Sequence, residues 1–292
     1  MELFTVYVAL VLVGLSLGSF AGATVWRLRA RQLIEDKADG EEYDKEEYKR
    51  LKKLTTSPLS KDRSQCLHCS YVLKWYDLLP LVSWISLGGK CRNCRKPIGY
   101  LEPLIELGVA LFFVISFLCW PYTLSNPIDS IRFIIWLIAG VAFAILFVYD
   151  LKWFLLPDKV TFVLIGLGII TSILTVIGSS DKGTAVGSIA GSVLILSGLY
   201  FVLNKISKGK WIGFGDVKLG LGLALLLADV RLAFIAIFAA NLIGTLIVLP
   251  PMIAGKLKRT AHVPFGPLLI LGTVVAQLAG LSLVDWYMTS LL

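Results

Sequence analysis

Four of the five cysteines in this chain form two C-x2-C pairs, Cys66 with Cys69 and Cys91 with Cys94, separated by 21 residues. Two thiolates from one tight turn and two from another suit a tetrahedral zinc ion. Such a site leaves no position open for a substrate, so the metal is expected to hold a fold and not to do chemistry. Free thiols or disulfides are the alternatives, and disulfides fit poorly with a reducing cytoplasm. His68, inside the first pair, is not expected to be a ligand.

Two aspartates lie where apolar runs end or begin. Asp150 ends one run in "LFVYD", and Asp216 opens another in "GFGDVKLG". If the two carboxylates lie close together, both cannot ionise easily, so one keeps its proton while the other activates a water molecule. An aspartic protease divides acid and base work in this way. Gly213 and Gly215, beside Asp216, would let an extended peptide backbone approach the carboxylate closely.

Simpler roles are open for the same residues. Asp216 could only cap a helix, and either aspartate could pair with a nearby lysine, Lys152 or Lys218. Asp158 follows a proline at an expected helix start, where an N-terminal cap is the usual role of an aspartate. Spacing alone does not choose between a catalytic pair and these local roles.

The elements that must position these residues are membrane helices. The chain has 292 residues and is 57% hydrophobic. Its mean hydropathy is +0.78, and apolar runs near 20 residues recur along most of it, so we expect an all-α polytopic membrane protein. The first run lacks a basic leading region and is too long for a signal peptide, so it is expected to be retained. Eight transmembrane helices are predicted, at about 3–25, 102–120, 131–150, 160–177, 184–204, 216–229, 231–251 and 266–284.

The basic residues predict which side of the membrane each loop occupies. A polar segment at about 27–100 holds 16 of the chain's 28 lysines and arginines. The positive-inside bias makes this segment cytoplasmic, and alternating spans then put Asp150 and Asp216 at the cytoplasmic side. The net charge of +8 is explained in the same way, with no nucleic-acid partner. Within the segment, 31–55 is expected to be a solvated helix or a mobile linker, and the cysteine pairs are expected to form a small cytoplasmic zinc module.

Taken together in this order, the motifs resemble those of the type IV prepilin peptidase family, a family of bifunctional leader peptidases and N-methyltransferases. The family's GxGD signature matches residues 213–216, and its D-x7-PD-like stretch matches Asp150 together with residues 157–158. The paired C-x2-C motifs match the four cysteines. In "EPLIEL", which resembles a further family stretch, Glu106 matches while Glu102 replaces a tyrosine. "GSFAGATVWR" departs from the family's usual pattern by carrying Gly22 in place of an asparagine.

The resemblance implies a function, residue roles and a domain division. A bacterial inner-membrane enzyme would cut the basic leader from prepilins or pseudopilins after a glycine, on the cytoplasmic side, and then methylate the new N-terminus with S-adenosylmethionine. Asp150 and Asp216 would be the protease pair, and Gly213 and Gly215 would shape the substrate groove. Residues 1–100 would form a methyltransferase-associated part with the zinc module, and 101–292 a seven-helix peptidase domain.

The sequence leaves the methyltransferase residues and three alternative functions undecided. Glu106 and the cysteine module are the nearest candidates for the methyltransferase, but Glu106 could equally be the buried ion-pair partner of an arginine. No glycine-rich nucleotide fingerprint places the methyl donor. The chain could be a peptidase without methyltransferase activity, a small transporter, or a zinc-anchored adaptor, although a transporter would normally show repeats or broken helices.

Overall fold

The computed structural model describes residues 2–55, 63–256 and 263–290. These residues are almost entirely helical, and the only strand-like pairing among them is two isolated bridges in the cysteine segment. The expected all-α class is therefore confirmed. The chain divides into two compact units, Met1–Ile115 and Ser116–Leu292, which are described separately below.

Seven helices in the described ranges are long and apolar enough to cross a membrane, which confirms a polytopic membrane protein. They are Leu3–Asp39, Leu101–Leu118, Pro127–Trp153, Asp158–Gly178, Lys182–Ser207, Val230–Ile253 and Phe265–Ser290. The count differs from the eight that the sequence predicts. The expected span at about 216–229 is helix α9 (Phe214–Leu227), which has only 14 residues, whereas a membrane crossing needs about 20.

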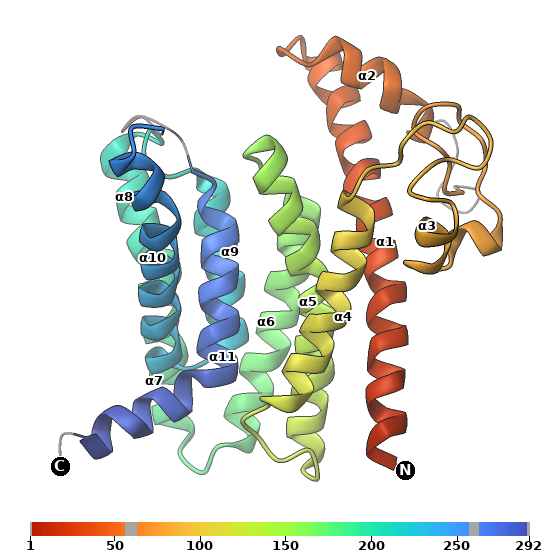
Figure 1. Cartoon of the computed structure of the whole chain (residues 1–292). Helices are drawn as coiled ribbons and strands as arrows, with labels where there is room; N and C mark the ends of the chain where they lie inside the picture. The colour runs from red at the N-terminus through yellow and green to blue at the C-terminus, as the bar shows by residue number, and fades with distance from the viewer. Residues whose placement is uncertain (1, 56–62, 257–262, 291–292) are drawn as a thin grey trace. The chain divides into compact units, whose positions relative to one another are not determined.

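The first unit begins with the long helix α1 (Glu2–Asp39) (Figure 1). This helix packs closely on α4 (Leu101–Leu118) through glycines spaced four residues apart. A Cβ atom on Gly14 would lie 2.6 Å from the Cα atom of Ala110, and one on Gly18 would lie 2.5 Å from the Cα atom of Glu106. Small residues at this spacing let two membrane helices approach at backbone distance. Gly18 thereby brings α1 directly against Glu106.

The charged stretch after the first span folds as helix, which agrees with the solvated-helix expectation and not with a mobile linker. It contains the end of α1, then α2 (Lys45–Leu51) and the 3₁₀ turn η1 (Lys52–Thr55). Asp44 caps α2 by accepting hydrogen bonds from the backbone N–H groups of Glu46 and Glu47. The guanidinium of Arg29 pairs with Glu47 at 2.8 Å, and both side chains are largely buried. A short 3₁₀ turn, η3 (Trp75–Leu78), and a short helix, α3 (Val82–Ser86), follow before α4.

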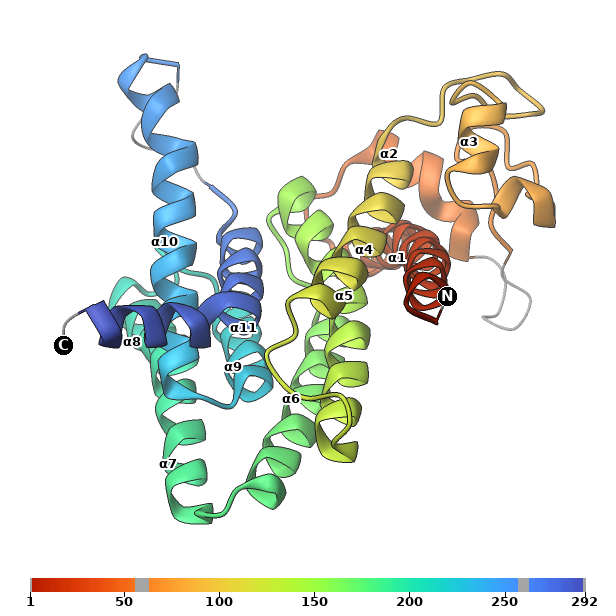
Figure 2. The ribbon, with the colours of Figure 1, turned by 60° about the horizontal axis from the view of Figure 1, so that its bottom comes forward.

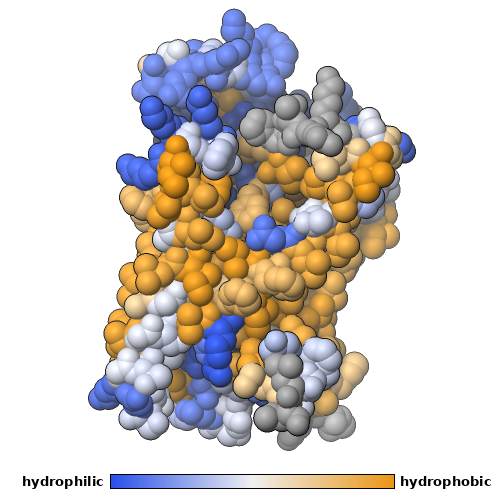
Figure 3. Space-filling model, turned by 90° about the vertical axis from the view of Figure 1, so that its left-hand side faces the viewer, coloured by the Kyte–Doolittle hydropathy of each residue, from blue (hydrophilic) through white to orange (hydrophobic). Residues whose placement is uncertain are grey.

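The second unit is a helical bundle (Figures 1 and 2). Its helices are α5 (Pro127–Trp153), α6 (Asp158–Gly178), α7 (Lys182–Val193), the π-helical turn η4 (Leu194–Gly198), α8 (Leu199–Ser207), α9, α10 (Val230–Ile253) and α11 (Phe265–Ser290). The helices α10 and α11 lie side by side, and α9 packs against α6, α7 and α11. The side of the unit that carries α7, α8 and α10 faces the viewer in Figure 3, where hydrophobic side chains cover the middle of the face.

Glycines allow α9 to sit deep within this bundle. A Cβ atom on Gly220 would lie 2.0 Å from the carbonyl oxygen of Leu196, and one on Gly168 of α6 would lie 2.7 Å from Leu225. These approaches leave no room for larger side chains. The glycines that follow Asp216 in the sequence therefore serve helix packing, and they hold the start of α9 firmly in the bundle.

Candidate active site and metal centre

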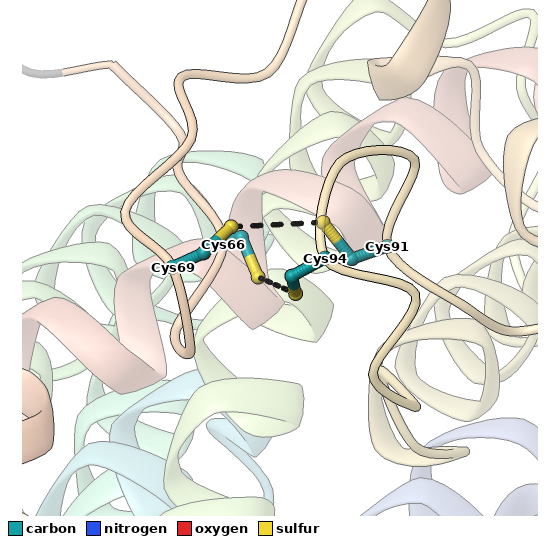
Figure 4. A group of neighbouring side chains, drawn as sticks. All are labelled: Cys66, Cys69, Cys91 and Cys94. Atoms are coloured by element: carbon teal, nitrogen blue, oxygen red, sulfur yellow. Dashed lines mark hydrogen bonds between the residues drawn. The ribbon is translucent and has the colours of Figure 1, made fainter.

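The four predicted metal ligands come together in the first unit (Figure 4). Their sulfur atoms all lie within 4.8 Å of one another. Cys66 and Cys94 lie 3.9 Å apart, as do Cys69 and Cys91, measured between Sγ atoms. Thiolates about 2.3 Å from one tetrahedral zinc ion are separated by about 3.8 Å. The four cysteines are free thiols rather than disulfides, and their geometry fits a closed four-sulfur metal site.

Two backbone knuckles of the same form present these sulfur atoms. In the first, the backbone N–H of Cys66 donates to the carbonyl of Tyr71 at 2.9 Å. In the second, the N–H of Cys91 donates to the carbonyl of Lys96, also at 2.9 Å. The residue after each second cysteine, Ser70 or Arg95, turns the chain with a φ near +60°. The matching turns explain why four ligands that are far apart in sequence can converge.

Two thiols of the cluster differ in how readily they lose a proton. A hydrogen bond from the backbone N–H of Tyr71 lowers the pKa of the Cys69 thiol to about 6, while burial raises the pKa of the Cys66 thiol to about 12. Only the thiolate form binds a metal, so a bound cation would compensate for the buried charge.

The segment between the two cysteine pairs packs on the cysteine module. Asp77, in η3, accepts a hydrogen bond from the guanidinium of Arg92 at 2.7 Å, next to the second knuckle. The indole N–H of Trp84 donates to the carbonyl of Gly99 at 2.8 Å. These two hydrogen bonds hold the segment against the cysteine module.

Glu106 of α4 contacts both α1 and the segment between the two cysteine pairs. Its side chain is 7% exposed. Its carboxylate accepts hydrogen bonds from the backbone N–H of Leu81 at 2.8 Å and from the hydroxyl of Ser19. Leu81 has a φ of +57°, a conformation that is costly for a leucine. One helical turn earlier, Glu102 accepts a hydrogen bond from the indole of Trp26 at 3.0 Å. Among the described residues the ion pairs include none at Glu106, so these polar neutral groups replace the arginine considered from sequence.

Asp150 is held rigidly near the C-terminal end of α5. Its side chain is 5% exposed, and its Oδ2 atom accepts a hydrogen bond from the backbone N–H of Gly266 at 3.0 Å. A Cβ atom at position 266 would lie 2.7 Å from the same oxygen, so only glycine fits there. No role was predicted for Gly266 from the sequence. The missing information was the approach of α11 to α5, which the sequence does not contain.

Asp216 lies in the first turn of α9 and interacts electrostatically with Asp150. The side chain of Leu156 would lie 3.4 Å from a Cβ atom on Gly266 and 3.3 Å from one on Gly215, so the two predicted carboxylates, from different helices, lie in the same region of the second unit. Gly213 precedes the helix, and a Cβ atom there would lie 3.5 Å from Asp216 Oδ2. A Cβ atom on Gly215 would lie 3.3 Å from Leu156, so this glycine faces a side chain of the bundle.

The structure corrects the expected role of Asp158. The sequence suggested that it caps α6, but α6 begins at Asp158 itself and the preceding residue, Pro157, provides no side-chain cap. The carboxylate of Asp158 instead pairs with Lys218 of α9. This pair also gives Lys218 a partner other than Asp216.

Comparisons with known proteins place the chain among its relatives. Residues 12–120 match the bacterial peptidase A24 N-terminal domain, and residues 131–249 match the type IV leader peptidase family. A prepilin leader peptidase/N-methyltransferase of Aeromonas hydrophila is 32% identical over 79% of this chain and 76% of its own length. A type 4 prepilin-like proteins leader peptide-processing enzyme of Escherichia coli is 30% identical over 89% of each chain. A prepilin leader peptidase/N-methyltransferase of Pseudomonas aeruginosa is 28% identical over 95% of this chain and 92% of its own. No solved structure matches the chain.

Proposed function

The chain belongs to the type IV leader peptidase family, and from this premise we propose that Asp150 and Asp216 are its catalytic pair. Membership confirms the resemblance read from the sequence and the expectation of an enzyme, and it argues against a transporter or an adaptor. The observation that carries the proposal is that carboxylates from α5 and α9 lie close enough to interact electrostatically, and that one of them accepts a hydrogen bond from the N–H of Gly266. A helix cap needs no such partner.

The pair would cleave a peptide bond by sharing one proton. The ionised carboxylate takes a proton from a water molecule as the water oxygen bonds to the carbonyl carbon. The protonated carboxyl gives its proton to the carbonyl oxygen, and the amine then leaves with a proton from the pair. Two carboxylates in one buried site cannot easily both be ionised, which supplies the required acid and base. Gly213, beside Asp216, would leave room for the substrate backbone, and Gly215 would set the packing beneath it.

The substrate we propose is a prepilin or pseudopilin whose basic leader is removed after a glycine. The relatives' names specify prepilin leaders. The ends of α5, α6 and α8 near the pair carry Lys152, Lys159 and Lys205, and such basic ends mark the cytoplasmic side. We therefore propose that cleavage takes place on the cytoplasmic side of a bacterial inner membrane.

The second activity we propose is N-methylation of the new N-terminus with S-adenosylmethionine, which supplies the methyl group. Residues 1–100, with the start of α4, would carry it, and 101–292 would form the peptidase domain. Glu106 is the proposed methyltransferase residue, because it is buried where "GSFAGATVWR", "DLLPLVSW" and "EPLIEL" converge. The four cysteines would hold a structural zinc ion that fixes the segment donating the Leu81 N–H.

One experiment tests both activities. Purified protein in lipid nanodiscs is incubated with a prepilin and S-adenosylmethionine, and the N-terminus of the product is determined by mass spectrometry. Asp150→Asn and Asp216→Asn should each abolish cleavage, since asparagine cannot exchange the proton. Asp285→Asn, on an exposed part of α11, is the matched control and should cleave normally.

The outcomes separate the proposals. Normal cleavage by either catalytic variant would refute the aspartic pair. A pilin that is cut but stays unmethylated by the wild-type enzyme would reduce the protein to a peptidase. If Glu106→Gln cuts normally but fails to methylate a precut pilin, Glu106 is assigned to the second step; normal methylation by that variant would remove the assignment.

A further inference from the structure

Tyr200 is a buried tyrosine whose role none of the motifs explains. Its side chain is 4% exposed, and its hydroxyl has no hydrogen-bond partner in the part of the chain that the structure describes. Buried polar groups in native proteins are nearly always paired, so an unpaired one needs a reason. A substrate group that reaches this hydroxyl would supply the missing hydrogen-bond partner.

The hydroxyl belongs to the site of the two aspartates. Tyr200 interacts electrostatically with Asp216. Its ring packs edge-on against Phe265, with ring centroids 5.4 Å apart. Phe265 directly precedes Gly266, whose N–H donates to Asp150. The ring of Tyr200 therefore packs beside the backbone segment that holds Asp150.

The π-helical turn η4 sets the direction of this side chain. A π turn inserts one extra residue, which rotates the following side chains by about 100° relative to a regular α-helix. η4 ends at Gly198, and Tyr200 is the second residue of α8. The turn is anchored on α9, because the hydroxyl of Ser197 donates to the carbonyl of Val217 at 3.0 Å, next to Asp216. Turns of this kind occur frequently at functional sites.

We propose that Tyr200 is a third catalytic group of the peptidase: its hydroxyl donates a hydrogen bond to the carbonyl oxygen of the scissile bond as negative charge develops there. This inference rests on the proposed peptidase function. The phenol keeps its proton throughout. Water adds to the carbonyl carbon and the two carboxylates exchange the protons as described above, while the tyrosine hydroxyl stabilises the negative charge that builds on the carbonyl oxygen before the carboxyl transfers its proton there.

Tyr200→Phe tests the proposal, because it removes the hydroxyl and keeps the ring against Phe265. We expect kcat for leader cleavage to fall about 10- to 100-fold, at or below the usual effect of losing one oxyanion donor, while KM stays within about twofold. We expect the melting temperature to stay the same or rise, because the unpaired buried hydroxyl is gone. A packing residue would give the opposite pattern, a lower melting temperature with little change in kcat.

Controls keep the outcome interpretable. Tyr287→Phe, on an exposed part of α11, should match the wild type in every measurement. A Tyr200→Phe variant with the kcat of the wild type would overturn the proposal. A fall in kcat would also overturn it if the fraction of folded protein fell by the same factor. If the asparagine variants of the aspartates still cleave, the peptidase proposal itself has failed; if they are inactive and Tyr200→Phe is fully active, only the tyrosine's role has failed.

Discussion

Replacing Gly266 with alanine should disable cleavage without unfolding the protein. The N–H of Gly266 donates to Asp150 Oδ2 at 3.0 Å, and the new methyl group would lie 2.7 Å from that oxygen. Real Cβ atoms almost never approach another atom so closely. Either the carboxylate or the start of α11 must therefore move.

The size of the effect follows from these distances. Ordinary contact between a carbon and an oxygen begins near 3.4 Å, so a displacement of roughly 0.7 Å is required. The hydrogen bond then lengthens past about 3.5 Å and is effectively lost. Losing a hydrogen bond to a charged group costs about 1.5–3 kcal/mol, and misplacing a reacting group by about 1 Å costs about 10²-fold in rate. We expect kcat/KM for leader cleavage to fall about 10- to 100-fold.

The assay is cleavage of a prepilin by purified protein in nanodiscs, followed by quantitative mass spectrometry at several substrate concentrations. Gly187→Ala is the matched control, because that helical glycine in α7 has no atom within 4 Å of an added Cβ. It should be active and about as stable as the wild type, or up to about 1 kcal/mol more stable. Full activity in Gly266→Ala would refute the idea that this glycine positions the catalytic carboxylate.

Two further predictions concern the metal module and an external helix cap. Removing the metal with a chelator, or introducing Cys69→Ser, should open the cysteine module, since structural zinc contributes on the order of 10 kcal/mol of apparent folding free energy in small modules. Methylation should then fall while leader cleavage persists. The control is Cys119→Ser, at an exposed cysteine outside the cluster, which should change neither activity. Hydrogen bonds from the side chain and backbone of Thr184 lower the pKa of Asp181, the cap of α7, below its ordinary value of 3.8. Because the folded-state pKa is depressed, the stability that the ionised cap contributes is complete at neutral pH and is lost as the pH falls below 3.8. Thermal unfolding at pH values between roughly 3 and 6 should show a steeper loss for the wild type than for Asp181→Asn, and equal slopes would contradict the assignment.

The sequence predicts most of the fold because hydropathy and length are properties of each segment alone. Seven of the eight expected spans correspond to helices of sufficient length. The exception, α9, shows what hydropathy does not record. Its sequence is as apolar as that of its neighbours, but the residue Ala228 adopts a left-handed conformation and ends the helix after 14 residues.

The site was predictable only as far as residue type and order. Asp150, Asp216 and the four cysteines could be named because carboxylates are costly in a membrane and paired thiols suit a metal, and because their order along the chain matches the motifs of the prepilin peptidase family. Gly266 and Tyr200 could not, because their importance depends on how α8 and α11 approach the aspartates. The π turn before α8 makes a hydrogen bond to α9, and no local residue pattern in the sequence predicts this turn.

The short length of α9 also bears on where the chemistry occurs. A 14-residue α-helix is about 21 Å long, whereas the hydrocarbon core of a membrane is about 30 Å thick. At least one end of α9 must then lie below a membrane surface, and exposed backbone ends are not tolerated in lipid. The contacts of α9 with α6, α7 and α11 remove this difficulty, because the helix is surrounded by protein. Broken backbone at membrane depth is otherwise found where protein lines a water-filled space. The protein contacts of α9 therefore allow its backbone ends to lie at membrane depth, which the proposed site at Asp216 requires.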